Sequence, residues 1–319
     1  MDNVISFILC AIPLGITFLY GAVGEIIVEK VGHLNLGIPG IMCMGGAGSC
    51  FALQLMSGKG IPPVLVVIIS ILAGFLTGAL MGLIYSFLTV SLRANQNVTG
   101  LVMTIFGVAL SNFIWRYISW DNCIYAMSYF RYPFKAQHGD LQYYGCMVYI
   151  AIAIAIATAI ILSKTRVGLN LRAVGENPAT ADAVGINVTR YKYVATCIGC
   201  GISALGGFFY IVGYSGTSQS YLAIEFLGWL AVALVIFTLW RPIVTIFGSV
   251  IFGAVYIMGS FLPSMFPGFF SGIGLWVKPL LNMTPYIVTI IVLIVTSIRN
   301  KKENQAPAGL GLPYFREER

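Results

Sequence analysis

Few residues of this chain have the types and spacing that solute or proton chemistry requires. Glu25 and Glu29 lie near the end of the first apolar run. If this run crosses a membrane, its carboxylates should face the bundle interior or water, since exposing them to lipid is costly. They could line a polar pathway or form its gate, and a solvated helix end is an equal alternative for Glu29. Asn35, Asn95 and Asn97 could hydrogen-bond a polar solute or tie helices together.

The seven cysteines predict little redox or metal chemistry. Cys197 and Cys200 are spaced as C-x-x-C, but no second pair accompanies them, and a metal or redox motif needs more context. Cysteines in apolar runs are more simply interpreted as small buried hydrophobes. Cys123 and Cys146 could both face the outside, which leaves a disulfide between them open. The two histidines are isolated, so no metal site is predicted.

Catalytic machinery is not apparent in the sequence. The segment 58–60 contains Gly-Lys-Gly but lacks the rest of a phosphate-binding G-x-x-x-x-G-K-[ST] loop. No paired carboxylates and no Ser/His/Asp set share a polar region. We therefore predict no catalytic residue, no cofactor and no ATP hydrolysis in this chain.

The composition explains why polar chemistry is so sparse. Of the 319 residues, 58% are hydrophobic and 9% are charged, whereas about 25% are charged in soluble proteins. So few charges cannot cover a fold in water, but they suffice in lipid. The sequence predicts an all-α integral membrane protein, a polytopic bundle of about nine transmembrane helices with a range of roughly eight to ten.

The apolar runs set the predicted spans, and polar segments separate them. Residues 264–283 are too interrupted by Gly and Pro for a span and are placed outside. The resulting organisation is a permease-sized membrane domain over 1–299 and a tail over 300–319. The nine predicted spans are 4–28, 36–56, 61–91, 97–118, 144–163, 191–213, 225–240, 242–262 and 284–299.

The distribution of Lys and Arg predicts the orientation, because these residues collect on the cytoplasmic side. With the N-terminus outside, 13 of the 18 basic residues fall in cytoplasmic segments and five in outer ones. This places the tail and the 164–190 connector in the cytoplasm. The asymmetry also accounts for the net charge of +7 without a nucleic-acid partner.

The 164–190 connector is the longest polar segment on that side. Asn177 is a good N-cap, Pro178 suits a first helical position and Gly185 suits a C-terminal stop. The sequence therefore predicts a short helix over 178–184 whose small side chains could dock into a groove of another protein. A plain connector on the membrane surface is the alternative.

The same segment resembles the cytoplasmic coupling loop of ABC-importer permeases of the branched-chain amino acid and ribose type. In that family the loop docks on the ATP-hydrolysing subunit. The resemblance assigns this contact to Arg172, Gly175, Glu176, Asn177, Pro178, Ala181, Gly185 and Ile186.

Three other segments agree with this resemblance. Residues 29–40 resemble the family's early turn, and residues 94–100 resemble the start of its fourth span. The tail 306–314 resembles the C-terminus of the nucleoside branch. The resemblance implies a nucleoside importer in the bacterial inner membrane. Its expected partners are a sister permease, ATPase subunits that carry ATP and Mg, and a periplasmic or extracellular substrate-binding lipoprotein.

Several alternatives stay open from the sequence. Sugar and branched-chain amino acid permeases share the same pattern. An ion-coupled secondary transporter would need more intramembrane ionisable groups or an inverted repeat, neither of which is evident. A membrane enzyme would need the catalytic residues that the sequence lacks.

Overall fold

The described part of the chain is helical and contains no β-strand. The computed structural model describes residues 2–131, 144–217, 219–265, 280, 283–299, 306–312 and 314. Eight helical segments in these ranges are long and apolar enough to cross a membrane. They correspond to the first eight predicted spans, so the prediction of a polytopic helical bundle is confirmed. The ninth predicted span coincides with α14, a helix of 16 residues.

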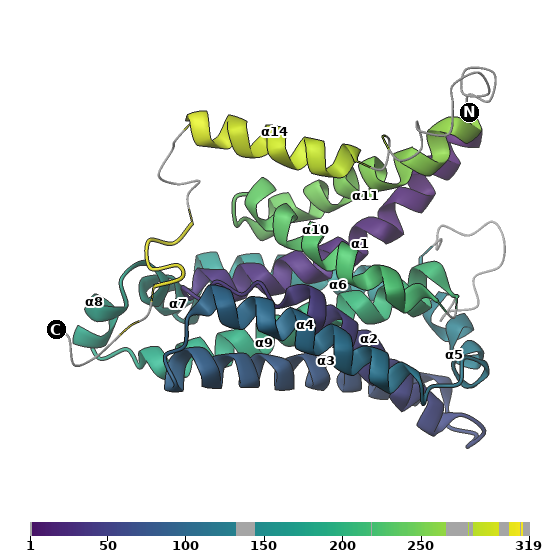
Figure 1. The fold of residues 1–319 in the computed structure, drawn as a ribbon, viewed down its shortest axis with the longest axis horizontal. Helices are drawn as coiled ribbons and strands as arrows, with labels where there is room; N and C mark the ends of the chain where they lie inside the picture. The colour runs from purple at the N-terminus through teal and green to yellow at the C-terminus, as the bar shows by residue number, and fades with distance from the viewer. Residues whose placement is uncertain are drawn as a thin grey trace.

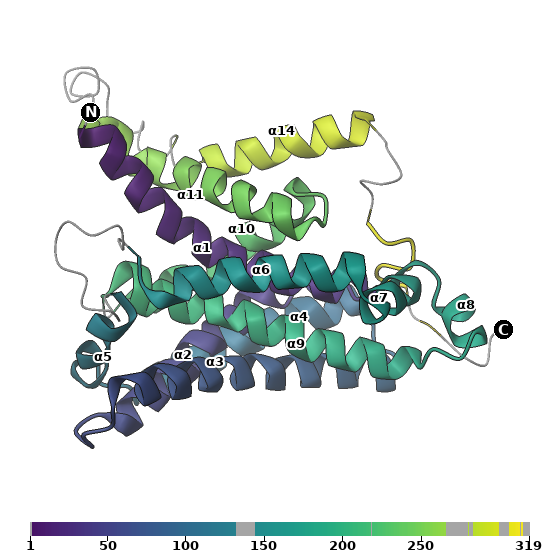
Figure 2. The ribbon, with the colours of Figure 1, turned by 180° about the vertical axis from the view of Figure 1, so that it is seen from behind.

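The helices run back and forth between two ends of the molecule (Figures 1 and 2). Most of the outer loop predicted at 264–283 lies outside the described residues. The α-helices are α1 (Asp2–Lys30), α2 (Ile38–Met56), α3 (Pro63–Ser86), α4 (Gln96–Trp115), α5 (Asp121–Arg131), α6 (Cys146–Lys164), α7 (Arg166–Glu176), α8 (Pro178–Ala183), α9 (Val188–Phe209), α10 (Ile224–Phe237), α11 (Pro242–Met265) and α14 (Thr284–Arg299). Short π or 3-10 segments η1 (Phe87–Ser91), η2 (Tyr210–Ser215) and η3 (Ser220–Ala223) extend α3, extend α9 and precede α10.

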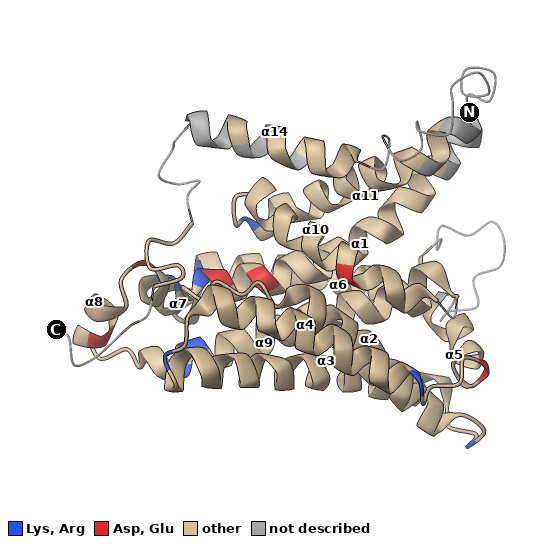
Figure 3. Ribbon diagram, viewed as in Figure 1, with Lys and Arg blue, Asp and Glu red and all other residues tan. Residues whose placement is uncertain are grey.

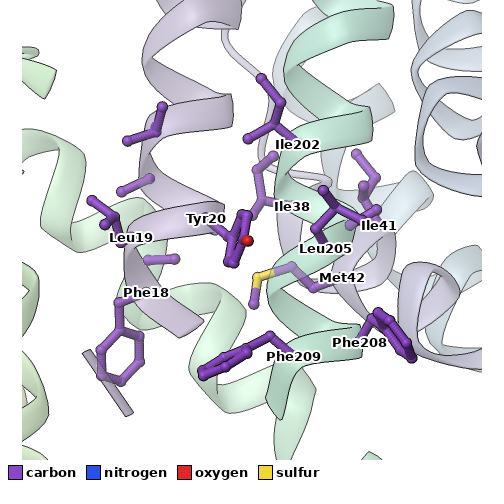
Figure 4. Close-up of a cluster of buried hydrophobic side chains, with 14 of the residues drawn as sticks. Phe18, Leu19, Tyr20, Ile38, Ile41, Met42, Ile202, Leu205, Phe208 and Phe209 are labelled. Atoms are coloured by element: carbon purple, nitrogen blue, oxygen red, sulfur yellow. The ribbon is translucent and has the colours of Figure 1, made fainter. Parts of the chain in front are cut away.

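Helix α9 is the centre of the bundle, since it packs against α1, α2 and α3. Small residues allow this close approach, as is typical of helix pairs in membranes. A side chain at Gly24 of α1 would lie 2.3 Å from the Gly199 carbonyl oxygen of α9. Between these helices lies a buried apolar cluster that includes Tyr20, Met42 and Phe209 (Figure 4). The Tyr20 hydroxyl donates to the Met147 carbonyl oxygen at 2.7 Å and so ties α1 to α6.

The two ends of the bundle differ in charge. We call one of them the basic end; it comprises the turns 31–37, 92–95 and 238–241, helices α7 and α8, and the tail 306–314. Most of the blue segments in Figure 3 lie there. Lys59 and Arg116 lie toward the opposite end, where α5 also lies. The basic residues near the basic end are Lys30, Arg93, Lys164, Arg166, Arg172, Arg190, Lys192 and Arg241.

Candidate functional site: the basic end and its polar core

The connector 164–190 folds into two short helices, each with a capping side chain. Thr165 Oγ1 accepts the Gly168 N–H at 3.1 Å at the start of α7. Asn177 Oδ1 accepts the Thr180 N–H at 3.0 Å at the start of α8. Helix α8 has Pro178 in its first turn and is followed by Gly185 at φ +88°. The predicted N-cap, proline and glycine stop are therefore confirmed, whereas α7 was not predicted.

The small residues of α8 do not all face outward. Ala181 is 2% exposed, so its side chain faces the interior of this chain. Its proposed contact with a partner needs correction: the exposed face consists of Ala179, Thr180, Ala183 and Val184. Val184 is 72% exposed, and its apolar surface is the feature that sequence reasoning missed.

Helix α7 lies against the end of α1. A side chain at Gly175 would sit 2.2 Å from the Lys30 carbonyl oxygen, so only glycine allows this approach. Gly175 is therefore an internal packing position of the basic end. Arg172 and Glu176 of the same helix are exposed.

The tail crosses the basic end and binds several of its elements. The Gly309 N–H donates to the Gly175 carbonyl oxygen at 2.9 Å, and the Gly311 N–H donates to that of Gly32 at 3.3 Å. Farther along, the Tyr314 hydroxyl donates to Asp182 Oδ2 of α8 at 2.9 Å. The tail thus connects α7, α8 and the turn 31–37.

Gln96 completes this connection from the first turn of α4. Its Oε1 accepts the Leu34 N–H at 2.8 Å, and its Nε2 donates to the Leu312 carbonyl oxygen at 3.4 Å. The Ala308 N–H also donates to Glu176 Oε2 at 3.2 Å. Sequence reasoning recognised the tail by resemblance but gave it no contact, because its partners are more than 100 residues away in the chain.

A polar core lies directly behind the turn 31–37. Glu25 and Asn35 are fully buried, and the Asn35 N–H donates to Glu25 Oε1 at 3.3 Å. Asn35 Nδ2 also donates to Cys200 Sγ of α9 at 3.5 Å. The other carboxylate oxygen of Glu25 has no hydrogen-bond partner. The structure therefore brings two of the predicted pathway residues together as a buried joint between α1, α9 and this turn.

His33 belongs to the same core. Its Nδ1 lies 2.9 Å from Thr196 Oγ1, and its ring packs edge-on against Tyr85 with centroids 5.8 Å apart. Burial, followed by the nearby Lys192 charge, lowers the pKa of His33 well below its ordinary value of 6.5. The imidazole is therefore neutral at neutral pH and serves as a packing and hydrogen-bonding group.

Glu29 is not a solvated helix end. It is 3% exposed, and the Trp240 indole N–H donates to its Oε2. This contact joins α1 to the turn between α10 and α11. The solvated interpretation was wrong because the partner lies 211 positions away in the chain.

Asn95 and Asn97 do not join the buried core. Asn95 Oδ1 accepts the N–H groups of Asn97 at 3.0 Å and Val98 at 3.2 Å. These bonds cap α4, and the Asn97 side chain is exposed. Of the four candidate pathway residues, these two form the start of a helix at the basic end.

The cysteines are free thiols. Cys123, which could have paired with Cys146, instead donates to the Cys50 carbonyl oxygen at 3.6 Å. Within the described ranges, no three His, Cys, Asp or Glu residues are grouped so that they could hold a metal ion. Cys200 is part of the buried polar core, where Asn35 occupies it.

A helical bundle with eight candidate spans and a capped, tail-bound connector at one end defines a multi-pass membrane protein of the transporter class. The chain belongs to the family described as branched-chain amino acid transport system / permease component, whose model matches residues 4–297. It is thus an ABC transporter permease, a subunit of the cell membrane.

Individual relatives cover most of the chain. The nucleoside ABC transporter permease protein NupC of Lactococcus lactis subsp. cremoris is 30% identical, over 86% of this chain and 87% of the relative. The guanosine ABC transporter permease protein NupQ of Bacillus subtilis is also 30% identical, over 93% and 92%. TsgC13 of Haloferax volcanii, an ABC transporter permease protein to which glucose is provisionally assigned, is 27% identical over 94% of both chains.

Proposed function

We propose that this chain is the permease that moves nucleosides inward. The similarity to NupC and NupQ carries the proposal, because both have names that specify nucleoside or guanosine transport and both align over most of the chain. The similarity to TsgC13 makes sugar import the second candidate. Family membership leaves no support for the ion-coupled transporter or the membrane enzyme.

The energy for transport enters through α8 in this proposal. ATP and Mg are bound by a separate ATPase subunit, which contacts the exposed face formed by Ala179, Thr180, Ala183 and Val184. Three features support this role: the face is exposed, the Asn177 cap fixes the start of the helix, and the tail binds its end through Tyr314. A sister permease and a substrate-binding lipoprotein complete the proposed importer.

The basic end faces the cytoplasm in this proposal, because Lys and Arg are concentrated there. Cysteine labelling from outside intact cells tests the orientation on a background without native cysteines. Position 175 is unsuitable, since a side chain there would meet the Lys30 carbonyl oxygen. Val184→Cys should be labelled only after permeabilisation, and the exposed Lys59→Cys without it. The reverse pattern would invert the topology.

Glu25 and Asn35 are proposed as a gate rather than a pathway lining, because both are fully buried in the structure. Glu25→Gln keeps the shape of the side chain and removes its ability to ionise. We expect it to reduce uptake at an unchanged amount of protein in the membrane. Wild-type uptake by this variant would show that the carboxylate has no part in gating.

The solute is tested by uptake of radiolabelled guanosine and uridine in cells that lack the gene. High-affinity uptake should disappear and return with a plasmid copy. Unlabelled glucose, ribose and leucine serve as competitors in the complemented strain. Unchanged nucleoside uptake together with lost sugar uptake would refute the nucleoside assignment and favour the second candidate.

A further inference from the structure

A cavity of about 540 Å³ lies at the basic end, on the side away from the tail-bound face of α8. Helix α6 forms one wall, and the α10–α11 turn with the start of α11 forms the other. The ends of α1 and α7 contribute to its rim. Its lining residues combine apolar walls with four cations. The apolar members include Ile156, Ile160, Leu162, Leu239, Trp240, Ile243 and Val244, and the cations are Lys30, Lys164, Arg172 and Arg241.

The apolar walls open toward the surroundings of the bundle. Ile156 and Ile160 are 45% and 53% exposed, and Ile243 and Val244 are 55% and 42% exposed. These residues belong to helices that could cross a membrane. The groove between them therefore meets lipid hydrocarbon, and acyl chains fit it without loss of polar contacts.

The cations give the cavity an excess of positive charge. Lys30 lies within electrostatic reach of Arg172 and Arg241, and also of two carboxylates, Glu29 and Glu176. Glu29 already accepts the Trp240 indole N–H, and Glu176 accepts a tail N–H. With Lys164, four cations thus face two engaged carboxylates, and an additional anion would be stabilised.

The α10–α11 turn is held in an unusual conformation beside these charges. Leu239 and Trp240 have φ values of 55° and 54°, in the left-handed region that bulky residues rarely adopt. Such conformations persist where surrounding contacts enforce them, and they are frequent at ligand sites. Here the Trp240–Glu29 hydrogen bond directs the indole inward, and Arg241 follows at the rim of the cavity.

We propose that this cavity binds an anionic phospholipid. The headgroup phosphate meets Lys164, Arg172 and Arg241, and the acyl chains lie along the exposed residues of α6 and α11. Basic pockets between transmembrane helices have the chemistry that anionic headgroups need. An acidic protein segment would match the charges but not the exposed apolar walls. The proposal requires only a membrane location and is independent of the transported solute.

Native mass spectrometry of the full-length chain in detergent tests the proposal by titration with phosphatidylglycerol or phosphatidylcholine. Phosphatidylglycerol should bind more tightly. Each cation near a membrane surface changes anionic lipid affinity about fivefold, so Lys164→Gln with Arg241→Gln should weaken binding roughly 30-fold. Arg166→Gln with Arg190→Gln removes the same charge at the same end but outside this cavity, and should leave the affinity unchanged.

The apolar walls are tested separately with Ile160→Trp, which fills the groove without changing its charge. It should weaken phosphatidylglycerol binding at an unchanged melting temperature, and Ile105→Trp on exposed α4 is its control. Equal binding of the two lipids, or equal effects of the two charge-neutralised pairs, would overturn the proposal. Displacement by inorganic phosphate alone would show a free-anion site instead. Loss of the lipid when partner subunits are coexpressed would show that a subunit contact occupies the cavity.

Discussion

Replacing Gly185 tests whether the geometry of α8 transmits force. Gly185 has φ +88° and ends the helix, with the Ile186 N–H donating to the Ala181 carbonyl oxygen at 3.0 Å. No neighbouring atom lies within 4 Å of a side chain built there, so a substitution meets no clash. Its cost is the conformation alone, about 1–2 kcal/mol for a residue with a Cβ. This corresponds to a factor of roughly 5 to 30 in the local equilibrium.

Such a cost is large for α8, because helices this short are marginal without outside support. Gly185→Val should therefore open the end of α8 and strongly reduce uptake. The exposed position should leave the overall melting temperature close to wild type, since surface changes usually stay within about 0.5 kcal/mol. Gly185→Asn is the matched control, because asparagine tolerates the left-handed region.

The assay combines solute uptake with copurification of the ATPase at matched membrane levels. We expect Gly185→Val to lose uptake, with the ATPase detached or hydrolysing ATP without transport. Gly185→Asn should retain most of both. Normal uptake by the valine variant would refute the role of α8 as the coupling element. Equal loss in both variants would mean that the left-handed conformation is not the reason for the glycine.

Three further predictions concern the same end of the protein. Val184→Asp should detach the ATPase at an unchanged melting temperature, whereas Ala181→Trp should lower that temperature because Ala181 is buried. Tyr314→Phe removes a bond to the Asp182 carboxylate, a type that contributes about 1.5–3 kcal/mol when shielded and less at this half-exposed site; limited proteolysis of α8 in inside-out vesicles should become faster. His33 stays neutral in the fold, so stability should be complete above about pH 6.5 and fall below it, by at most about 1.4 kcal/mol per pH unit. His33→Gln should flatten this fall in thermal melts.

Each of these predictions has a clear contrary result. Equal melting temperatures for the two α8 variants would place Ala181 on the surface. Unchanged proteolysis of Tyr314→Phe would mean that the tail does not hold α8. Parallel acid profiles for wild type and His33→Gln would assign the pH dependence to other groups.

The sequence was sufficient for the spans because bilayer thickness imposes a length that apolar runs must match. The run 61–91 illustrates this, since the structure has one continuous helical segment, Pro63–Ser91, at that position. The predicted α8 was also accessible, because Asn177, Pro178 and Gly185 act through local backbone geometry. Helix α7 was missed because Gly168 and Gly175 lower its helix propensity, while its packing against α1 requires them.

The contacts of the polar core could not be predicted in the same way. Glu29 and Trp240 are 211 positions apart, and His33 and Thr196 are 163 apart. Each residue gives a weak signal alone, and only the fold pairs them. The direction of Ala181 was misjudged for a related reason: a run of small residues shows that close packing is possible, but not which side of the helix is covered.

The tail contacts also have a consequence for biogenesis. Residues 306–314 are synthesised after all eight candidate spans, yet they bind α7, α8 and the turn after α1. A nascent chain can therefore insert into the membrane before its α7–α8 surface is complete. A chain that stops short of residue 306 would present α8 without the Tyr314 contact. Completion of translation and completion of this surface thus coincide, and a partner that recognises the tail-bound form of α8 would select finished chains.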